Sequence, residues 1–187
     1  MARPPDHKRR QDLLLGALTY AAQHGLADLS LRPLARALGT SDRMLLHYFG
    51  TKDELIGQAL VASRPDVRSL VGRQSLASVG AGARVLWKDM VSGGDQEPRV
   101  RLLLEVLALA MTQPDLYGEH ARRAIADWVA PLADALRSLG MHGDAEARAT
   151  LLVDGLRGLA LDYYVTGDRA RVSMAAEFLI ASVTATS

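Results

Sequence analysis

Residues 30–55 of this 187-residue chain, SLRPLARALGTSDRMLLHYFGTKDEL, contain the pattern that decides the fold. Ser30 is placed to cap a short helix that ends before Gly39, since hydroxyl residues favour helix N-caps and glycine favours the position after the last turn. Ser41 is a second N-cap and predicts a helix over 42–48. Two short helices joined by a tight turn are typical of a helix-turn-helix, whose second helix enters the DNA major groove.

The neighbouring segments extend this stretch to a three-helix domain. Residues 6–24 carry apolar side chains at helical spacing and predict a helix before it. Leu45 and Phe49 lie four residues apart, so they share one face and are expected to dock the second short helix on the others. Thr51, followed by Glu54 three residues later, predicts a capping box that starts a further helix.

Once these two apolar residues face inward, the second helix presents a polar stripe outward. Arg43 can bind a guanine edge bidentately or grip a phosphate, and Leu46 can meet a thymine methyl. The ammonium of Lys52 and the N-terminus of its helix can share a phosphate. An ordinary solvated surface remains the alternative. The residues expected to contact DNA are Ser30, Arg32, Ser41, Asp42, Arg43, Met44, Leu46, His47, Tyr48 and Lys52.

Composition supports an all-helical chain but says little about partners. Hydrophobic residues make up 49 % and aromatic residues only 5 %, so the core is built mainly from Leu, Val and Ala. The net charge is +1, divided into +2 for residues 1–60 and −1 for the remainder. Four early cations, Arg3, Lys8, Arg9 and Arg10, suit a phosphate-binding arm, or equally a solvated terminus. The absence of cysteine excludes disulfides and thiolate metal sites.

The segment resembles the N-terminal domain of the TetR family of bacterial repressors over about residues 8–60. The matching positions are Ser30, Leu34, Ala35, Leu38-Gly39, Ser41, Leu45, Tyr48-Phe49, Thr51-Lys52 and Glu54-Leu55. Two positions depart from the family pattern. Leu46 stands where a phosphate-contacting Tyr is common, and Gly50 where Pro is frequent. The resemblance implies a DNA-binding domain, 1–55, followed by a ligand-binding and dimerisation domain, 56–187, with about nine helices in all.

The resemblance also implies a pocket for a small hydrophobic effector in the second domain. The candidate lining residues are Trp87, Leu103, Leu107, Met111, Trp128 and Tyr163. Apolar residues at helical spacing fit a filled core equally well, so that alternative stays open. The helix over 98–112 is apolar almost all round, and its one acid, Glu105, is expected on an exposed edge beside Arg101 rather than on an effector.

The last two helices predict a symmetric homodimer. Mid-helix glycines at 155 and 158 permit the close approach of another backbone. The final helix has two apolar faces, one with Val172, Ala176 and Val183 and a second with Met174 and Phe178, and two faces need two partners. The expected dimer residues are Gly155, Gly158, Asp162, Val172, Ala175, Ala176, Leu179 and Val183. Burial of the helix within a monomer is the alternative.

No catalytic, metal or cofactor motif stands out. The chain lacks HExxH, GxSxG and a phosphate loop, and its five histidines show no ligand spacing. No apolar run is long enough to span a bilayer, so we expect a cytoplasmic protein without membrane contact. The predicted function is a palindrome-binding repressor that a small molecule releases. The alternatives are a DNA-binding dimer without an effector, and a helical-bundle enzyme with its site in the C-terminal cavity.

Overall fold

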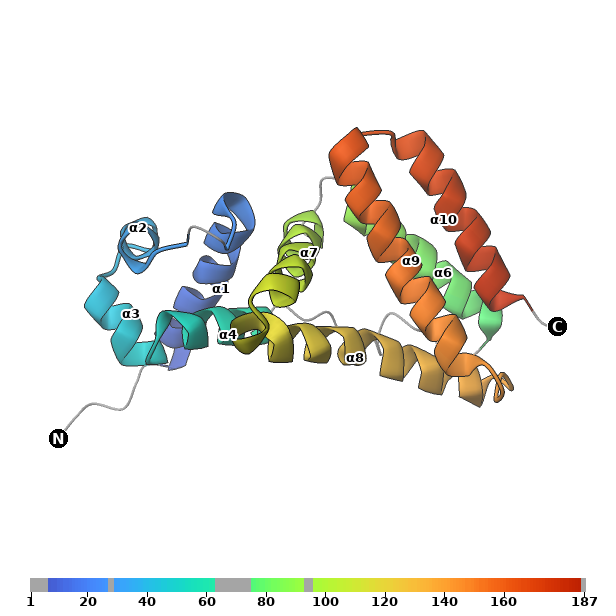
Figure 1. Ribbon diagram of the computed structural model, residues 1–187, viewed down its shortest axis with the longest axis horizontal. Helices are drawn as coiled ribbons and strands as arrows, with labels where there is room; N and C mark the ends of the chain where they lie inside the picture. The colour runs from blue at the N-terminus through green and yellow to red at the C-terminus, as the bar shows by residue number, and fades with distance from the viewer. Residues whose placement is uncertain (1–6, 27–28, 63–74, 93–95, 186–187) are drawn as a thin grey trace. The chain divides into compact units, whose positions relative to one another are not determined.

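The computed structural model describes residues 7–26, 29–62, 75–92 and 96–185. These ranges contain nine α-helices and no strand, which confirms the all-α prediction (Figure 1). The helices are α1 (His7–His24), α2 (Leu31–Ala37), α3 (Asp42–Phe49), α4 (Lys52–Ala62), α6 (Leu76–Val91), α7 (Gln96–Thr112), α8 (Pro114–Ser138), α9 (Ala145–Thr166) and α10 (Arg169–Thr184).

The chain divides into two compact units. The first, which we call the reader unit, contains residues 1–64 and 101–121, and the second contains 65–100 and 122–187. This division differs from the predicted boundary after residue 55, because α4 continues the first unit and a distant segment joins it. Both α7 and α8 contribute residues to each unit.

One apolar core holds the reader unit together. Leu34 of α2, Leu45 and Phe49 of α3, and Leu55 of α4 are buried in it against the apolar face of α1. The 101–121 segment adds Leu102, Val106, Tyr117 and Ala121 to the same core. Burial of this apolar surface away from water stabilises the packing of the helices. Segments far apart in the sequence contribute to this one core.

Local signals set the ends of the reader helices largely as expected. Gly25, Gly39 and Gly50 each adopt a positive φ directly after or near a helix end, where a side chain would be strained. Ser41 caps α3, and its Oγ accepts a hydrogen bond from the Met44 amide at 3.2 Å. Ser30 occupies the N-cap of α2 as predicted, but its side chain makes no capping bond.

The second unit is built on α6, α9 and α10, which pack on one another. Polar side chains link its helices at several points. Arg157 of α9 donates to the Ala124 carbonyl of α8 at 3.2 Å, and Tyr164 of α9 donates to the Met90 carbonyl of α6 at 2.7 Å. Trp87 of α6 donates to Ser173 Oγ of α10 at 3.1 Å.

Candidate nucleic-acid interface

Helix α3 is fixed to the reader unit by one face and leaves the other in solvent. Leu45 and Phe49 expose only 1 % and 3 % of their surface, as the four-residue spacing predicted. On the opposite face Arg43, Leu46 and His47 are exposed. Leu46 exposes 43 % of its surface. Its side chain can therefore meet an apolar group such as a thymine methyl.

The remaining predicted DNA residues of this helix lie around the exposed face. Ser41, Asp42 and Met44 are exposed, whereas Tyr48 is half-buried and packs against the reader core. The Tyr48 ring meets the His47 ring edge to face, with centroids 5.6 Å apart. Tyr48 therefore supports the orientation of α3 and leaves only part of its ring for a ligand.

Ser30 and Arg32 lie at the start of α2, and both are exposed. Lys52, by contrast, is already engaged. Its Nζ donates a hydrogen bond to the Leu29 carbonyl at 2.7 Å, so the ammonium ties α4 to the turn before α2. A phosphate contact by Lys52 would have to share or displace this bond, a constraint that the sequence pattern did not indicate.

The basic N-terminal residues do not act as one group. Arg10, expected in a phosphate-binding arm, instead lies 5.2 Å from the centroid of the Phe49 ring, and its guanidinium donates to Gln58 Oε1. It thus connects α1 with α3 and α4 in a cation–π and hydrogen-bonded contact. Lys8 and Arg9 are exposed, and Arg3 falls outside the described residues.

The turn between α3 and α4 is held by the predicted capping box. The Thr51 amide donates to Glu54 Oε2 at 2.9 Å, and the Glu54 amide donates to Thr51 Oγ1 at 3.1 Å. Gly50 has φ +81°, and a Cβ at this position would collide with the Glu54 carboxylate. Proline, with φ near −65°, could not adopt this backbone, so Gly50 and the local geometry agree.

The predicted effector residues are not brought together in one unit. Leu103 and Leu107 lie on the part of α7 that belongs to the reader unit, and Leu107 packs against the reader core. Met111, near the C-terminal end of α7, is 80 % exposed, so it lies outside the buried core, and its role in effector binding stays a prediction. The apolar run of α7 simply ends in solvent there.

The three other effector candidates lie in the second unit and have structural contacts. Trp87 is buried and bonded to Ser173 as described above. The Arg157 guanidinium lies 5.9 Å from the centroid of the half-buried Trp128 ring and pairs with Asp154 at 3.0 Å. Burial lowers the pKa of Arg157, and Asp154 opposes that shift. Tyr163 is half-buried.

The reader unit contains a small apolar cavity of about 10 Å³, which has room for no more than a water-sized group. It is lined by Ala17, Ala21, Leu26, Leu29, Leu34, Leu55, Ile56, Ala59 and Leu102. This cavity cannot admit an effector, and it contains none of the six predicted lining residues.

Glu105 is partly buried rather than on the exposed edge that the sequence predicted. Its Oε1 accepts a hydrogen bond from the Leu26 amide at 2.7 Å, and the side chain is partly buried. The sequence offered one signal, a single acid inside an apolar helix, because such an acid must find a donor when buried. The donor itself, 79 residues away, could not be identified from the sequence.

The predicted dimer residues of α10 are mostly buried within the protomer. Val172, Ala176 and Val183 are fully buried within the protomer, so they cannot form a contact between copies. Gly155 of α9 is covered by Leu179, whose methyl a Cβ at position 155 would strike. The close approach that the glycine permits is therefore made inside the protomer by Leu179. A dimer contact by Ala175 or Leu179, which are half-buried, stays a prediction.

A different face of α9 and α10 remains exposed. Val165 and Phe178 expose 78 % and 74 % of their surface, and Leu161 and Met174 are also exposed. Gly158 lies on the same side of α9 with nothing near its missing side chain. We call this the α9–α10 apolar face, formed by Leu151, Gly158, Leu161, Val165, Met174, Phe178 and Ala181.

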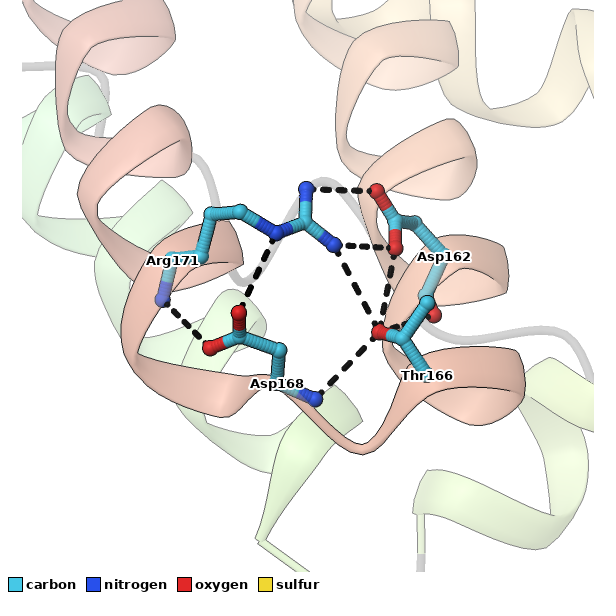
Figure 2. A network of polar contacts seen from close by, with 4 residues as sticks. All are labelled: Asp162, Thr166, Asp168 and Arg171. Atoms are coloured by element: carbon cyan, nitrogen blue, oxygen red, sulfur yellow. Dashed lines mark hydrogen bonds and ion pairs between the residues drawn. The ribbon is translucent and has the colours of Figure 1, made fainter.

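A polar network fixes the turn that joins these two helices. Arg171 of α10 forms a bidentate ion pair with Asp162 of α9, at 2.6 and 2.9 Å, and a further bond to Asp168 at 3.2 Å (Figure 2). Thr166 Oγ1 donates to Asp162, and Asp168 caps α10 through the Arg171 amide. These bonds lower the pKa of Asp162 and raise that of Arg171. Asp162 therefore sets the hairpin geometry within the protomer.

The described part of the chain contains neither a metal-binding cluster nor a membrane-spanning helix. No group of three or more His, Asp or Glu residues is arranged to hold a metal ion there. Within the same residues, no helix is long and apolar enough to cross a membrane.

Comparison with known proteins gives matches to one family. Residues 13–59 match the model for bacterial regulatory proteins of the tetR family. The HTH-type transcriptional regulator BetI of Stenotrophomonas maltophilia (strain R551-3) is 27 % identical over 113 residues, which make up 58 % of this chain and 57 % of BetI. The HTH-type transcriptional repressor Rv1474c of Mycobacterium tuberculosis is 27 % identical over 129 residues, 69 % of this chain and 65 % of the repressor. The chain thus spans less than two thirds of the length of these curated relatives.

A solved structure extends the likeness to the whole fold. A TetR-family transcriptional regulator from Cytophaga hutchinsonii aligns with a TM-score of 0.78 over 100 % of both chains, at 20 % identity. At this identity the match shows that the two chains share a fold.

Proposed function

Because this chain belongs to the tetR family of bacterial regulatory proteins, we propose that it is a DNA-binding transcriptional regulator that reads a palindromic operator as a homodimer. The observation that carries this proposal is the exposed side of α3. Arg43, Leu46 and His47 point away from a helix that Leu45 and Phe49 anchor, so the helix can enter a major groove without leaving its core.

Different residues of the interface have different tasks under this proposal. Arg43 reads a base edge or holds a phosphate, and Leu46 offers an apolar contact where a base presents a methyl. Ser30, Arg32 and Ser41 lie at helix starts beside this face and suit phosphate contacts, which position the reader without selecting sequence. Lys52 contacts a phosphate while its ammonium also bonds the Leu29 carbonyl.

The homodimer is proposed on the α9–α10 apolar face. A helix pair with apolar side chains as exposed as Val165 and Phe178 is costly in water, and such exposure is a common mark of a protein contact. A second copy is the partner that presents the same surface in a two-fold arrangement. Two readers about one DNA turn apart, roughly 34–36 Å, would then bind a palindrome.

Repression, with release by a small molecule, is the proposed mode of action. The mycobacterial relative is named a transcriptional repressor, which supports repression rather than activation. An effector would release DNA by favouring a conformation in which the distance between the two α3 helices does not fit the operator. The size of this shift is limited by the difference between the effector's affinities for the two conformations. We expect the protein to act in the cytoplasm, where its DNA target lies, and by binding rather than catalysis.

The test is selection of bound DNA from a random pool, followed by gel shifts with variants. Arg43→Ala should weaken binding about ten- to a hundredfold and relax base choice at one operator position. Lys52→Ala should weaken binding to all sequences alike. Arg137→Ala, an exposed arginine of the second unit, is the matched control and should change nothing. Unchanged affinity in both Arg43 and Lys52 variants would contradict the proposal.

The effector part has its own test. A thermal-shift screen of small hydrophobic compounds should find one that stabilises the protein and weakens operator binding. A screen without any such compound would favour a DNA-binding dimer that senses nothing, and turnover of a compound would favour an enzyme.

A further inference from the structure

We propose that Glu105 of α7 is a positioning residue for DNA binding, which holds the turn before α2 so that the helix-turn-helix stays in the arrangement that fits DNA. The inference rests on the proposed function and names a residue that touches no DNA. It concerns only contacts inside the reader unit, to which residues 101–121 belong.

The turn between α1 and α2 is bound at both ends by charged side chains from other helices. Glu105 Oε1 accepts from the Leu26 amide at 2.7 Å, and Lys52 Nζ donates to the Leu29 carbonyl at 2.7 Å. The turn itself adds a hydrogen bond from the Leu29 amide to the Leu26 carbonyl at 3.2 Å. Bonds to ionised groups are about twice as strong as neutral ones, so these two contacts are strong links between Leu26 and Leu29 and the helices α7 and α4.

The space around Gly25 fits this role. Gly25 ends α1 with φ +82°, and a Cβ there would lie 3.2 Å from Glu105 Oε1. The carboxylate therefore sits directly against the backbone that leaves α1. A residue with a side chain at position 25 would be strained and would crowd the carboxylate away from the Leu26 amide.

Apolar contacts hold the carboxylate in place. Leu102 and Val106, the neighbours of Glu105 on α7, expose 2 % and 1 % of their surface in the core that also contains Leu26, Leu29 and Leu34. Because close-packed side chains resist sliding, the carboxylate has little freedom to leave the turn. Leu34 is on α2, so the same core links α7 to the first helix of the helix-turn-helix.

The path from this turn to the DNA-facing helix is short. Ser30 follows the turn directly and begins α2, and the Leu34 amide donates to the Ser30 carbonyl. Helix α2 packs on α3, which carries Arg43 and Leu46. A turn that samples other conformations would tilt α2, and α3 with it, while the reader core remained folded.

The expected size follows from the fraction of competent readers. Apparent affinity falls in proportion to the population of the binding-competent state. If loss of the carboxylate leaves each reader competent about a third of the time, a dimer that needs both readers binds roughly tenfold more weakly. Glu105→Gln retains an oxygen acceptor of the same shape, so it should lose no more than about threefold.

The experiment compares full-length Glu105→Ala, Glu105→Gln and Val106→Ala with the unaltered protein. Operator affinity is measured by fluorescence anisotropy on the selected palindrome, and hydrogen exchange of the Leu26 amide by NMR. Val106→Ala is the matched control, because it removes volume from the same helix and core but keeps the Glu105 bond. We expect faster Leu26 exchange and about tenfold weaker binding only in Glu105→Ala, with near-complete rescue in Glu105→Gln.

Equal operator affinity of Glu105→Ala and the unaltered protein overturns the inference and leaves the proposed function intact. An equal loss in Val106→Ala also overturns it, because that result reports destabilisation alone. If Glu105→Ala does not fold, Glu105→Gln decides: faster Leu26 exchange with unchanged affinity refutes the positioning role. If the unaltered protein selects no DNA, the proposed function fails, and this inference fails with it.

Discussion

Truncation of Phe178 should break the proposed dimer without harming the protomer. Phe178 lies on the α9–α10 apolar face and exposes 74 % of its surface. Full burial of a phenylalanine side chain contributes about 1.5–3 kcal/mol, so burial of three quarters of it contributes about 2 kcal/mol. A two-fold interface uses the residue twice, and Phe178→Ala should therefore cost about 4 kcal/mol of association free energy. That is roughly a thousandfold in the dimer dissociation constant.

The matched control is Val172→Ala, on the same helix but buried inside the protomer with no exposed surface. It should lower the free energy of unfolding by about 0.5–2 kcal/mol, an estimate that scales the known cost of removing buried methyl groups, and leave association unchanged. Sedimentation velocity over a range of protein concentrations measures the association of both variants. The reasoning is refuted if Phe178→Ala associates like the unaltered protein, or if Val172→Ala is the variant that dissociates.

Two further predictions concern stability. Arg171 holds the pKa of Asp162 below its ordinary value of 3.8, so the stabilisation by this pair is present above that pH and is lost as the pH falls through the lowered pKa. Urea unfolding should therefore show Asp162→Asn less stable than the unaltered protein at pH 7, with the difference in stability shrinking as the pH falls below 3.8 through the lowered pKa. A difference that stays constant as the pH is lowered would contradict the ion pair. Gly50→Ala should cost more than the roughly 1–2 kcal/mol of a side chain at positive φ, because its Cβ also strikes the Glu54 carboxylate. Gly39 also has a positive φ, but a Cβ there would meet no atom within 4 Å, so Gly39→Ala is the control. Equal losses of stability in the two variants would rule out a contribution from the clash with Glu54.

Local sequence was sufficient to predict the helix-turn-helix. Ser41 with the Met44 amide, and Thr51 with Glu54, form their capping bonds within three residues along the chain. Such contacts depend only on neighbouring residues and on helix geometry, so a pattern in the sequence identifies them. The inward turn of Leu45 follows in the same way from helical spacing.

Helix α10 shows where periodicity stops being informative. The sequence correctly indicates two apolar faces on α10, but it cannot assign them to partners, since both have the same helical spacing and both consist of apolar side chains. The structure buries the face with Val172 and exposes the one with Phe178. The exposed face contains the larger side chains, Met174 and Phe178, whereas the smaller alanines fit the tight contact between helices within the protomer.

The sequence by itself determined the all-helical class, the helix ends and the exposed stripe of α3, because each arises from interactions between residues a few positions apart. Only the tertiary structure decided what distant side chains do. Glu105 meets Leu26 across 79 residues, and Arg10 meets the Phe49 ring across helices. Those partners are chosen by the packing of whole helices around a shared core, and no local pattern encodes which donor a buried carboxylate will reach.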